Sequence, residues 1–181
     1  NPICIESPPH KFKYFVTSLY IMFNEEEQIT KNYYADTNTA QFYLNLWGGD
    51  SIHIGLYDDY YSYNRDLDSN QKKKDIKHAI NNKKIMLTKL INTYCKETHN
   101  IADFGSGFGG TSRYLYERIK HNVIDNYDIS TNNCLINTKK NLEYGFKMSV
   151  YNRSFLNTEA PTSFYDIVYS EDSFIHINNR N

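Results

Sequence analysis

Residues 101–110 read Ile-Ala-Asp-Phe-Gly-Ser-Gly-Phe-Gly-Gly, and this stretch decides the fold class. The short apolar run at 101–104 predicts a buried strand, and the glycines after it allow a sharp turn. A helical pattern follows over residues 111–120. The free backbone N–H groups at the start of that helix would then face any ligand lying against the glycines. The spacing Gly105-x-Gly107-x-x-Gly110 also matches the dinucleotide-binding fingerprint, and a tight turn without a ligand is the alternative explanation.

Strands and helices alternate downstream of this turn. The expected strands are residues 101–104, 122–127, 147–151 and 165–169. Helical patterns over 111–120 and through Leu135 and Leu142 separate the first three strands. Alternation of this kind is typical of a parallel sheet covered by helices on both faces. The sequence therefore predicts an α/β fold with a doubly wound sheet.

The upstream half predicts a helical cap on this sheet. Residues 31–64 are rich in aromatic side chains, and 66–74 form a charged linker that leads into a helix. The apolar stripe of this helix is Ile76, Ile80, Leu87, Ile91 and Tyr94. Its opposite face, with Lys73, Lys77 and Lys84, is expected to be solvated. We expect a lead-in at 1–30, a cap and helix at 31–98, and half of a cofactor-binding domain at 99–181.

Composition excludes several classes of protein. The 181 residues contain 20 Lys and Arg against 21 Asp and Glu, a net charge of −1 that argues against nucleic-acid binding. Cys4, Cys95 and Cys134 are widely spaced, so we expect neither a disulfide framework nor a metal site. The same cysteine pattern favours a reducing compartment, so we expect a cytoplasmic location. The apolar stretch 14–23 is too short to span a membrane.

Two acids favour one cofactor over another. Asp128 follows Gly105 by 23 residues at the end of the second strand, where a carboxylate can accept hydrogen bonds from ribose hydroxyls. Asp103 lies inside the first strand and would suit a cationic group such as the ammonium of an amino acid. The alternative for Asp103 is a side chain that binds backbone N–H groups of the loop. Ribose and ammonium without pyrophosphate indicate S-adenosylmethionine rather than NAD.

These motifs resemble those of S-adenosylmethionine-dependent methyltransferases. Residues 101–110 look like their motif I, and residues 165–176, Tyr-Asp-Ile-Val-Tyr-Ser-Glu-Asp-Ser-Phe-Ile-His, look like their fourth-strand motif. The segments 32–36, 42–43 and 47–57 are similar to glycine/sarcosine and dimethylglycine N-methyltransferases, and more loosely to phosphoethanolamine N-methyltransferases. The resemblance implies a Rossmann-like sheet of seven strands. Only four are readable here, so we expect a sheet truncated after the fourth, completed by the rest of the domain or by a partner chain.

The resemblance also implies a role for each matched residue. The implied cofactor contacts are Ile52 and His53 at the methionine end, Asp103, Gly105 and Gly107 at the turn, Asp128 and Ile129 at the ribose and adenine, Ser154 and Phe155 at the adenine edge, and Ser170 after the fourth strand. The implied catalytic residues are Asp172 and His176, which face the substrate, and the lid tyrosine Tyr34.

Methyl transfer to an amine gives these last residues a chemical purpose. The reaction needs a neutral, well-positioned nitrogen, and a carboxylate with an imidazole could orient the amine and take its proton. Asp172 and His176 would share one face if their loop enters a helix. The predicted function is the N-terminal portion of an N-methyltransferase for a small amine such as glycine, sarcosine, dimethylglycine or phosphoethanolamine. The alternatives are a methyltransferase for a lipid or another acceptor, a truncated cofactor-binding module without activity, and a disfavoured NAD-dependent oxidoreductase.

Overall fold

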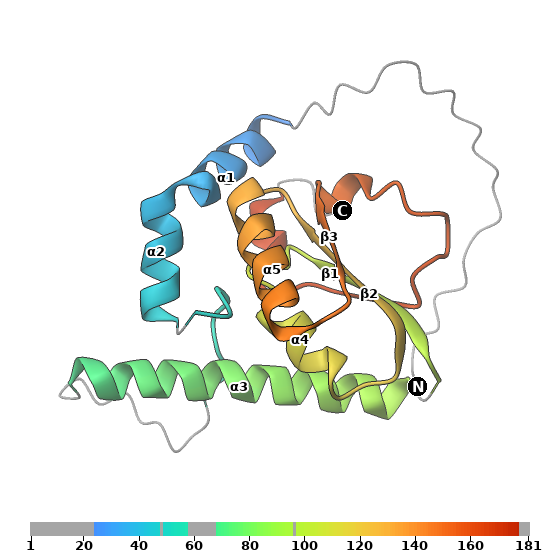
Figure 1. Ribbon diagram of the computed structural model, residues 1–181, viewed down its shortest axis with the longest axis horizontal. Coiled ribbons are helices and arrows are strands. Elements are labelled where there is room, and N and C mark those ends of the chain that lie inside the picture. The colour runs from blue at the N-terminus through green and yellow to red at the C-terminus, as the bar shows by residue number, and fades with distance from the viewer. Residues whose placement is uncertain (1–23, 48, 58–67, 96, 178–181) are drawn as a thin grey trace.

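In the described part of the chain, three helices precede the sheet (Figure 1). The computed structural model describes residues 24–47, 49–57, 68–95 and 97–177. The first helices are α1 (Glu25–Ala35), α2 (Thr37–Leu46) and α3 (Ser69–Tyr94). Helix α1 begins within the expected lead-in because Asn24 and Glu27 form a capping box, each side chain accepting the other's backbone N–H. The rest of the lead-in lies outside the described residues.

The sheet has four parallel strands in the order β3-β2-β1-β4. The strands are β1 (His99–Phe104), β2 (His121–Asp128), β3 (Ser149–Asn152) and β4 (Ile167–Tyr169). The remaining elements are α4 (Gly110–Tyr116), α5 (Thr131–Tyr144) and two 3₁₀ helices, η1 (Phe155–Asn157) and η2 (Phe174–His176). On β1, Ala102 pairs with Asp125 on one side and Val168 on the other. The predicted α/β fold with a parallel sheet is confirmed, and β1 is flanked on both sides by strands.

One face of the sheet holds the core. The buried cluster joins α3 and α4 to three strands through Ile91, Ile101, Leu115, Ile119, Ile124 and Tyr169. Helix α5 covers the same face, where the Asn137 amide donates to Asn126 Oδ1 of β2. The opposite face carries Phe104 and Tyr127, whose rings meet edge to face at 5.6 Å. The carboxyl ends of the strands therefore lie between a helical layer and an aromatic layer.

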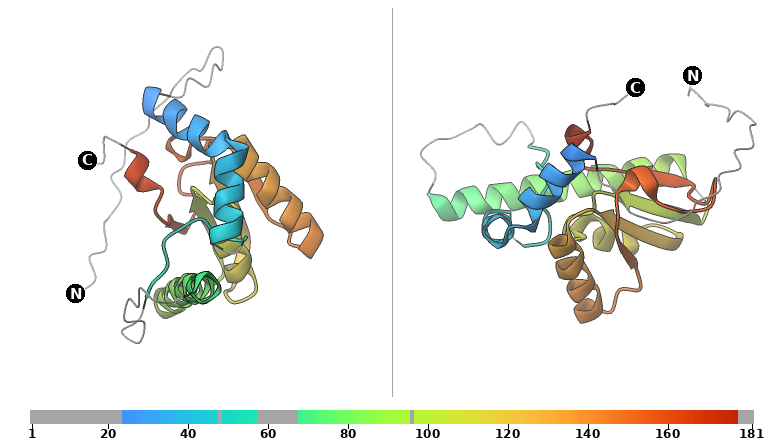
Figure 2. Two further views of the ribbon diagram at one scale, coloured as in Figure 1. Left: turned by 90° about the vertical axis from the view of Figure 1, so that its left-hand side faces the viewer. Right: turned by 90° about the horizontal axis from the view of Figure 1, so that it is seen from above.

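Helix α1 covers the carboxyl end of the sheet. It lies against α5 on one side and η2 on the other (Figure 2). The Ser130 hydroxyl, just after β2, donates to the backbone oxygen of Tyr34 at 3.0 Å. This arrangement confirms the predicted N-terminal helical cap and brings residues from α1 to the ends of β1, β2 and β4.

Helix α3 differs in two places from the sequence prediction. Lys84, expected on a solvated face, is only 9% exposed, whereas Tyr94, expected on the buried stripe, is 74% exposed. Lys84 is buried because the segment 49–57 lies along α3. Its Leu56 N–H donates to the oxygen of Ala79 at 2.8 Å, and a Cβ on Gly55 would meet that same turn at 2.5 Å. This segment covers α3 at Lys84, whereas Lys73 and Lys77 on the same face are exposed as predicted.

Candidate functional site

A pocket opens at the carboxyl ends of the strands. It contains about 690 Å³ of space free of atoms, part of it open to solvent. Its walls come from α1, the glycine turn, and the segments that follow β2, β3 and β4. Most of the predicted site residues line this main pocket: Tyr34, Ile52, Gly105, Asp128, Ile129, Ser154, Phe155, Asp172 and His176. With Ile52 from the segment 49–57, residues from six separate parts of the chain thus meet around one space.

The glycine turn lets other segments approach the backbone. The N–H groups of Gly105 and Ser106 both donate to the Tyr127 oxygen, which ties the turn to β2. Gly105 has a φ of +78°, and a Cβ there would lie 2.1 Å from Ser173 Oγ. Gly107 has a φ of +53°, and its Cβ would come within 2.9 Å of Ile52. Glycine is required at these positions because a side chain would displace the segments that close the pocket.

Asp128 is fixed in the pocket wall at the end of β2. Its Oδ2 accepts the Gly107 N–H at 2.9 Å, and its Oδ1 accepts the Ser130 N–H at 2.8 Å and the Asn133 amide at 3.3 Å. Burial raises the pKa of Asp128, and the backbone N–H groups oppose that rise. The carboxylate is therefore held in one orientation by the same turn that shapes the pocket.

The end of β4 and helix η2 bring the predicted catalytic residues to the pocket. The Tyr34 hydroxyl lies 3.3 Å from His176 Nε2, and the two rings meet edge to face at 5.7 Å. Burial lowers the pKa of His176 and raises that of Tyr34, so the imidazole is biased towards its neutral, proton-accepting form. A side chain from the cap and one from the end of the sheet thus form a pair.

Asp172 lies in a turn rather than on a helix. It has a φ of +62° and precedes η2, so the expected common helix face with His176 is wrong. Its Oδ2 accepts the Ile54 N–H at 2.6 Å, and its Oδ1 accepts from Lys83 Nζ of α3 at 3.1 Å. The carboxylate still borders the main pocket, held there by the segment before α3 and by α3 itself.

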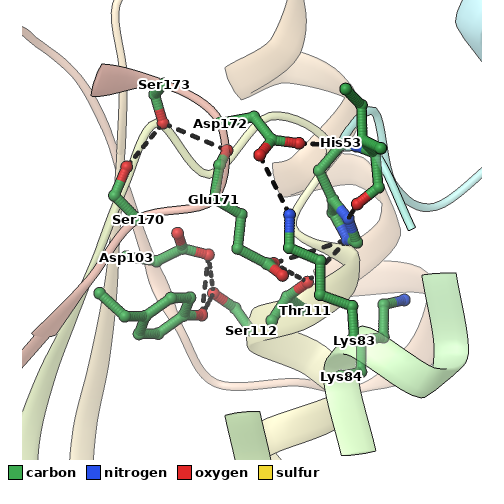
Figure 3. A network of polar contacts seen from close by, with 12 residues as sticks. His53, Lys83, Lys84, Asp103, Thr111, Ser112, Ser170, Glu171, Asp172 and Ser173 are labelled. Atoms are coloured by element: carbon green, nitrogen blue, oxygen red, sulfur yellow. Dashed lines mark hydrogen bonds and ion pairs between the residues drawn. The ribbon is translucent and has the colours of Figure 1, made fainter. Parts of the chain in front are cut away.

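A smaller inner pocket borders the glycine turn at Gly105, Ser106 and Gly110. Figure 3 shows the polar contacts among the other side chains around it. The pocket is also bordered by His53, Asp103, Thr111 and Glu171. The Thr111 hydroxyl donates to Glu171 Oε2 at 2.5 Å, and His53 Nε2 lies 3.3 Å from Thr111 Oγ1. Burial lowers the pKa of His53, with the Glu171 charge opposing that change. Sequence reasoning missed Glu171 and Thr111, although Glu171 lies inside the quoted fourth-strand motif, next to Asp172.

Asp103 faces this inner pocket and not the main one. Its Oδ2 accepts hydrogen bonds from the hydroxyls of Ser112 at 2.6 Å and Tyr169 at 2.8 Å. No backbone N–H group of the described residues donates to it, so the interpretation of Asp103 as a clamp on the loop is wrong. Burial raises the pKa of Asp103 to about 7, against the opposing effect of the Ser112 hydroxyl.

Ser154 and Phe155 line the main pocket after β3, whereas Ser170 lies outside both pockets. The Ser154 hydroxyl donates to Glu27 of α1 and accepts the Leu156 N–H. The Phe155 ring stacks on Phe104 with centroids 5.3 Å apart. Ser170 contacts Ser173 at 2.8 Å and borders neither pocket.

The main pocket is acidic. Glu27, Asp128, Glu171 and Asp172 line it, and no Lys or Arg among the described residues does. One oxygen of Glu171, Oε1, is buried without a hydrogen-bond partner among the described residues. A buried carboxylate oxygen of this kind is stabilised by a positively charged ligand. The electrostatics of the pocket therefore favour a cation.

Two further observations concern the part of the chain that the structure describes. Within it, no helix is long and apolar enough to cross a membrane. The same residues contain no group of three or more His, Cys, Asp or Glu side chains arranged to hold a metal ion.

Comparison with known proteins finds relatives but no matching protein-family model. The chain is 28% identical over 158 residues to a sarcosine/dimethylglycine N-methyltransferase of Aphanothece halophytica, covering 83% of this chain and 50% of that protein. It is 26% identical over 162 residues to a glycine/sarcosine/dimethylglycine N-methyltransferase of Actinopolyspora halophila, covering 88% and 26% respectively. The chain spans about half the length, or less, of the curated relatives that it matches.

Solved structures agree with the sequence comparison. A Galdieria sulphuraria protein assigned as a sarcosine dimethylglycine methyltransferase is 26% identical, with a TM-score of 0.62 over 76% of this chain and 49% of that one. The magnesium protoporphyrin IX methyltransferase of Synechocystis PCC 6803, solved with bound SAM, is 17% identical with a TM-score of 0.59, covering 88% and 66%. The similarity to the Synechocystis structure supports the fold of this chain alone. The predicted resemblance to S-adenosylmethionine-dependent methyltransferases, and their Rossmann-like fold, are confirmed.

Proposed function

We propose that this chain is part of an S-adenosylmethionine-dependent N-methyltransferase that acts on a small amine. The observation that carries the proposal is the acidic main pocket, where the glycine turn and the buried Asp128 meet the Tyr34–His176 pair. Relatives named for sarcosine and dimethylglycine methylation support the substrate class, with glycine and phosphoethanolamine as further candidates. The rest of the methyltransferase domain, or a partner chain, would complete the pocket.

The residues present suit this cofactor. The Asp128 carboxylate has one lone pair left, on Oδ2, to accept from a ribose hydroxyl, and Gly105 presents bare backbone. Ile129 and Phe155 offer apolar surface for an adenine ring. The unpartnered Glu171 oxygen suits the positive charge of the methionine end. S-adenosylmethionine would supply a methyl group on a sulfonium, which leaves this chain the tasks of binding, orientation and proton transfer.

The proposed catalytic task belongs to the Tyr34–His176 pair. A neutral imidazole can accept a proton from the amine at whichever nitrogen faces it, and burial keeps the pKa of His176 low. The Tyr34 hydroxyl would hold the imidazole orientation through the 3.3 Å contact with Nε2. Asp172, fixed by Lys83 and the Ile54 N–H, would attract the ammonium form of the substrate into the pocket. Positioning of this kind contributes most of the rate in such transfers.

A cytoplasmic location is part of the same proposal. The thiols of Cys95 and Cys134 are free in the structure. Free thiols are usual in a reducing compartment such as the cytosol.

Calorimetric binding tests the cofactor assignment. S-adenosylhomocysteine should bind more tightly than NAD, and Asp128→Asn should weaken it at least tenfold, about 1.4 kcal/mol. Asp125→Asn is the matched control, because Asp125 is also a buried acid of β2 but lies outside the main pocket. Tighter binding of NAD, or equal losses in the two variants, would contradict the assignment. Methyl transfer to glycine, sarcosine, dimethylglycine and phosphoethanolamine would then identify the acceptor.

A further inference from the structure

A second cavity, the α3 cavity, lies beside α3 and away from the main pocket. It contains about 430 Å³ of space free of atoms, part of it open to solvent. Trp47, Ser51 and Lys84 border it, and the exposed side chains of Lys77 and Asn81 lie along the same stretch of helix. No residue that lines the main pocket also lines this cavity, although Ser51 borders the inner pocket as well.

Two hydrogen-bond donors in this wall are buried without partners among the described residues. Trp47 Nε1 and Ser51 Oγ have no hydrogen-bond partner among the described residues, and Ser51 is only 4% exposed. Lys84 lies beside them in the same wall and is 9% exposed; burial lowers its pKa, and the charges of Asp50 and Glu171 oppose that change. Buried donors of this kind lower stability unless an acceptor is supplied. Two of them beside a largely buried lysine at one cavity indicate that an acceptor binds there.

The charges around the cavity favour an anion as that acceptor. Lys84 and Lys77 contribute two positive charges to its wall. Asp50 is the acid that borders it, but the Asp50 carboxylate already accepts from Lys140 Nζ at 2.5 Å and lies 3.7 Å from the Arg113 guanidinium. A neutral water could satisfy the indole and the hydroxyl, but an anion would satisfy them and would also pair with the charges of Lys84 and Lys77.

We propose that the α3 cavity binds an oxyanion, the carboxylate or phosphate group of a small molecule. Lys84, the Trp47 indole N–H and the Ser51 hydroxyl would all donate to it. Ser51 directly precedes Ile52 and His53, which border the main and inner pockets. The bound anion would therefore steady this segment from the side opposite the main pocket. This site is additional to the proposed methyl-transfer function and does not depend on it.

Calorimetric titration of the purified protein with sodium phosphate and sodium acetate tests the site and distinguishes the two oxyanions. Ionic strength is kept constant with sodium chloride. We expect saturable binding of at least one of the two anions, weakened at least tenfold by Lys84→Met. The matched control is Lys89→Met, which removes the same charge from an exposed position of α3. Absence of saturable binding, or an equal loss in the control, would overturn the proposal.

Two further measurements exclude misfolding and overlap with the cofactor. Lys84→Met removes a buried charge, so the melting temperature of this variant without phosphate should not fall below that of the unmodified protein. Ser51→Ala removes one of the proposed donors and should weaken phosphate binding at least threefold. Saturating S-adenosylhomocysteine should leave phosphate binding in place. Displacement of phosphate by S-adenosylhomocysteine would place the anion in the cofactor pocket and refute a separate site.

Discussion

Replacement of Asp103 by Asn should remove a pH dependence from the stability of this protein. Burial raises the pKa of Asp103 from 3.8 to about 7 in the folded chain. Between these two pH values the unfolded chain has lost the proton that the folded chain still holds, so stability falls as the pH rises. A difference of about three pKa units corresponds to about 4 kcal/mol, lost between about pH 4 and 7 and constant above that range.

Urea denaturation at half-unit steps from pH 4 to 8.5 gives the free energy of unfolding of the unmodified protein and of Asp103→Asn. The difference between these two free energies at each pH measures the effect. The Asn side chain keeps an acceptor oxygen for the Ser112 and Tyr169 hydroxyls. Tyr169→Phe gives an independent check, because removing a donor to the carboxylate should raise the pKa of Asp103 further and extend the decline to higher pH. The reasoning would be refuted if the difference in free energy of unfolding between the two proteins varied by less than about 1 kcal/mol over this pH range.

Three other substitutions test the site. In the complete enzyme, His176→Ala should lower kcat by about 10²–10⁴, while the affinity for S-adenosylhomocysteine changes less than about threefold. Because burial lowers the pKa of His176, the rate of the unmodified enzyme should fall with decreasing pH only below about pH 6.5. This acid limb should be lost in the variant. Gly105→Ala should destabilise the fold by at least about 2 kcal/mol in urea, since its φ is +78° and its Cβ would overlap Ser173 Oγ, and adding Ser173→Gly should recover part of that loss. Lys83→Met should change stability by less than about 1 kcal/mol, because the ion pair with Asp172 is partly exposed; a larger loss in urea would show a stronger coupling than the geometry implies.

The sheet was predictable because its signals are local. The apolar run 101–104, the glycines after it and the carboxylate at Asp128 each specify a backbone conformation or a strand end within a few residues. The start of α1 was missed, although the Asn24–Glu27 spacing is a capping-box signal that the sequence carries.

Long-range contacts explain most of what the sequence could not predict. The burial of Lys84 depends on a segment that folds back on α3 from earlier in the chain. The partners of Asp103 come from α4 and β4, so no local pattern distinguishes a carboxylate that binds a ligand from one that binds hydroxyls. Asp172 departs from helical geometry because the Ile54 N–H and Lys83 hold it in a turn. Spacing alone assigned it to the same helix face as His176.

The indole of Trp47 gives the α3 cavity an optical reporter. The sequence contains one tryptophan, and its Nε1 is buried in the wall of that cavity. Excitation at the red edge of the aromatic absorption band selects tryptophan over the 17 tyrosines, so all the emission comes from a single known position. The emission wavelength of an indole depends on the charges and dipoles next to its N–H group. Fluorescence from the unlabelled protein therefore follows events beside α3 without contribution from the main pocket, whose lining contains no tryptophan among the described residues.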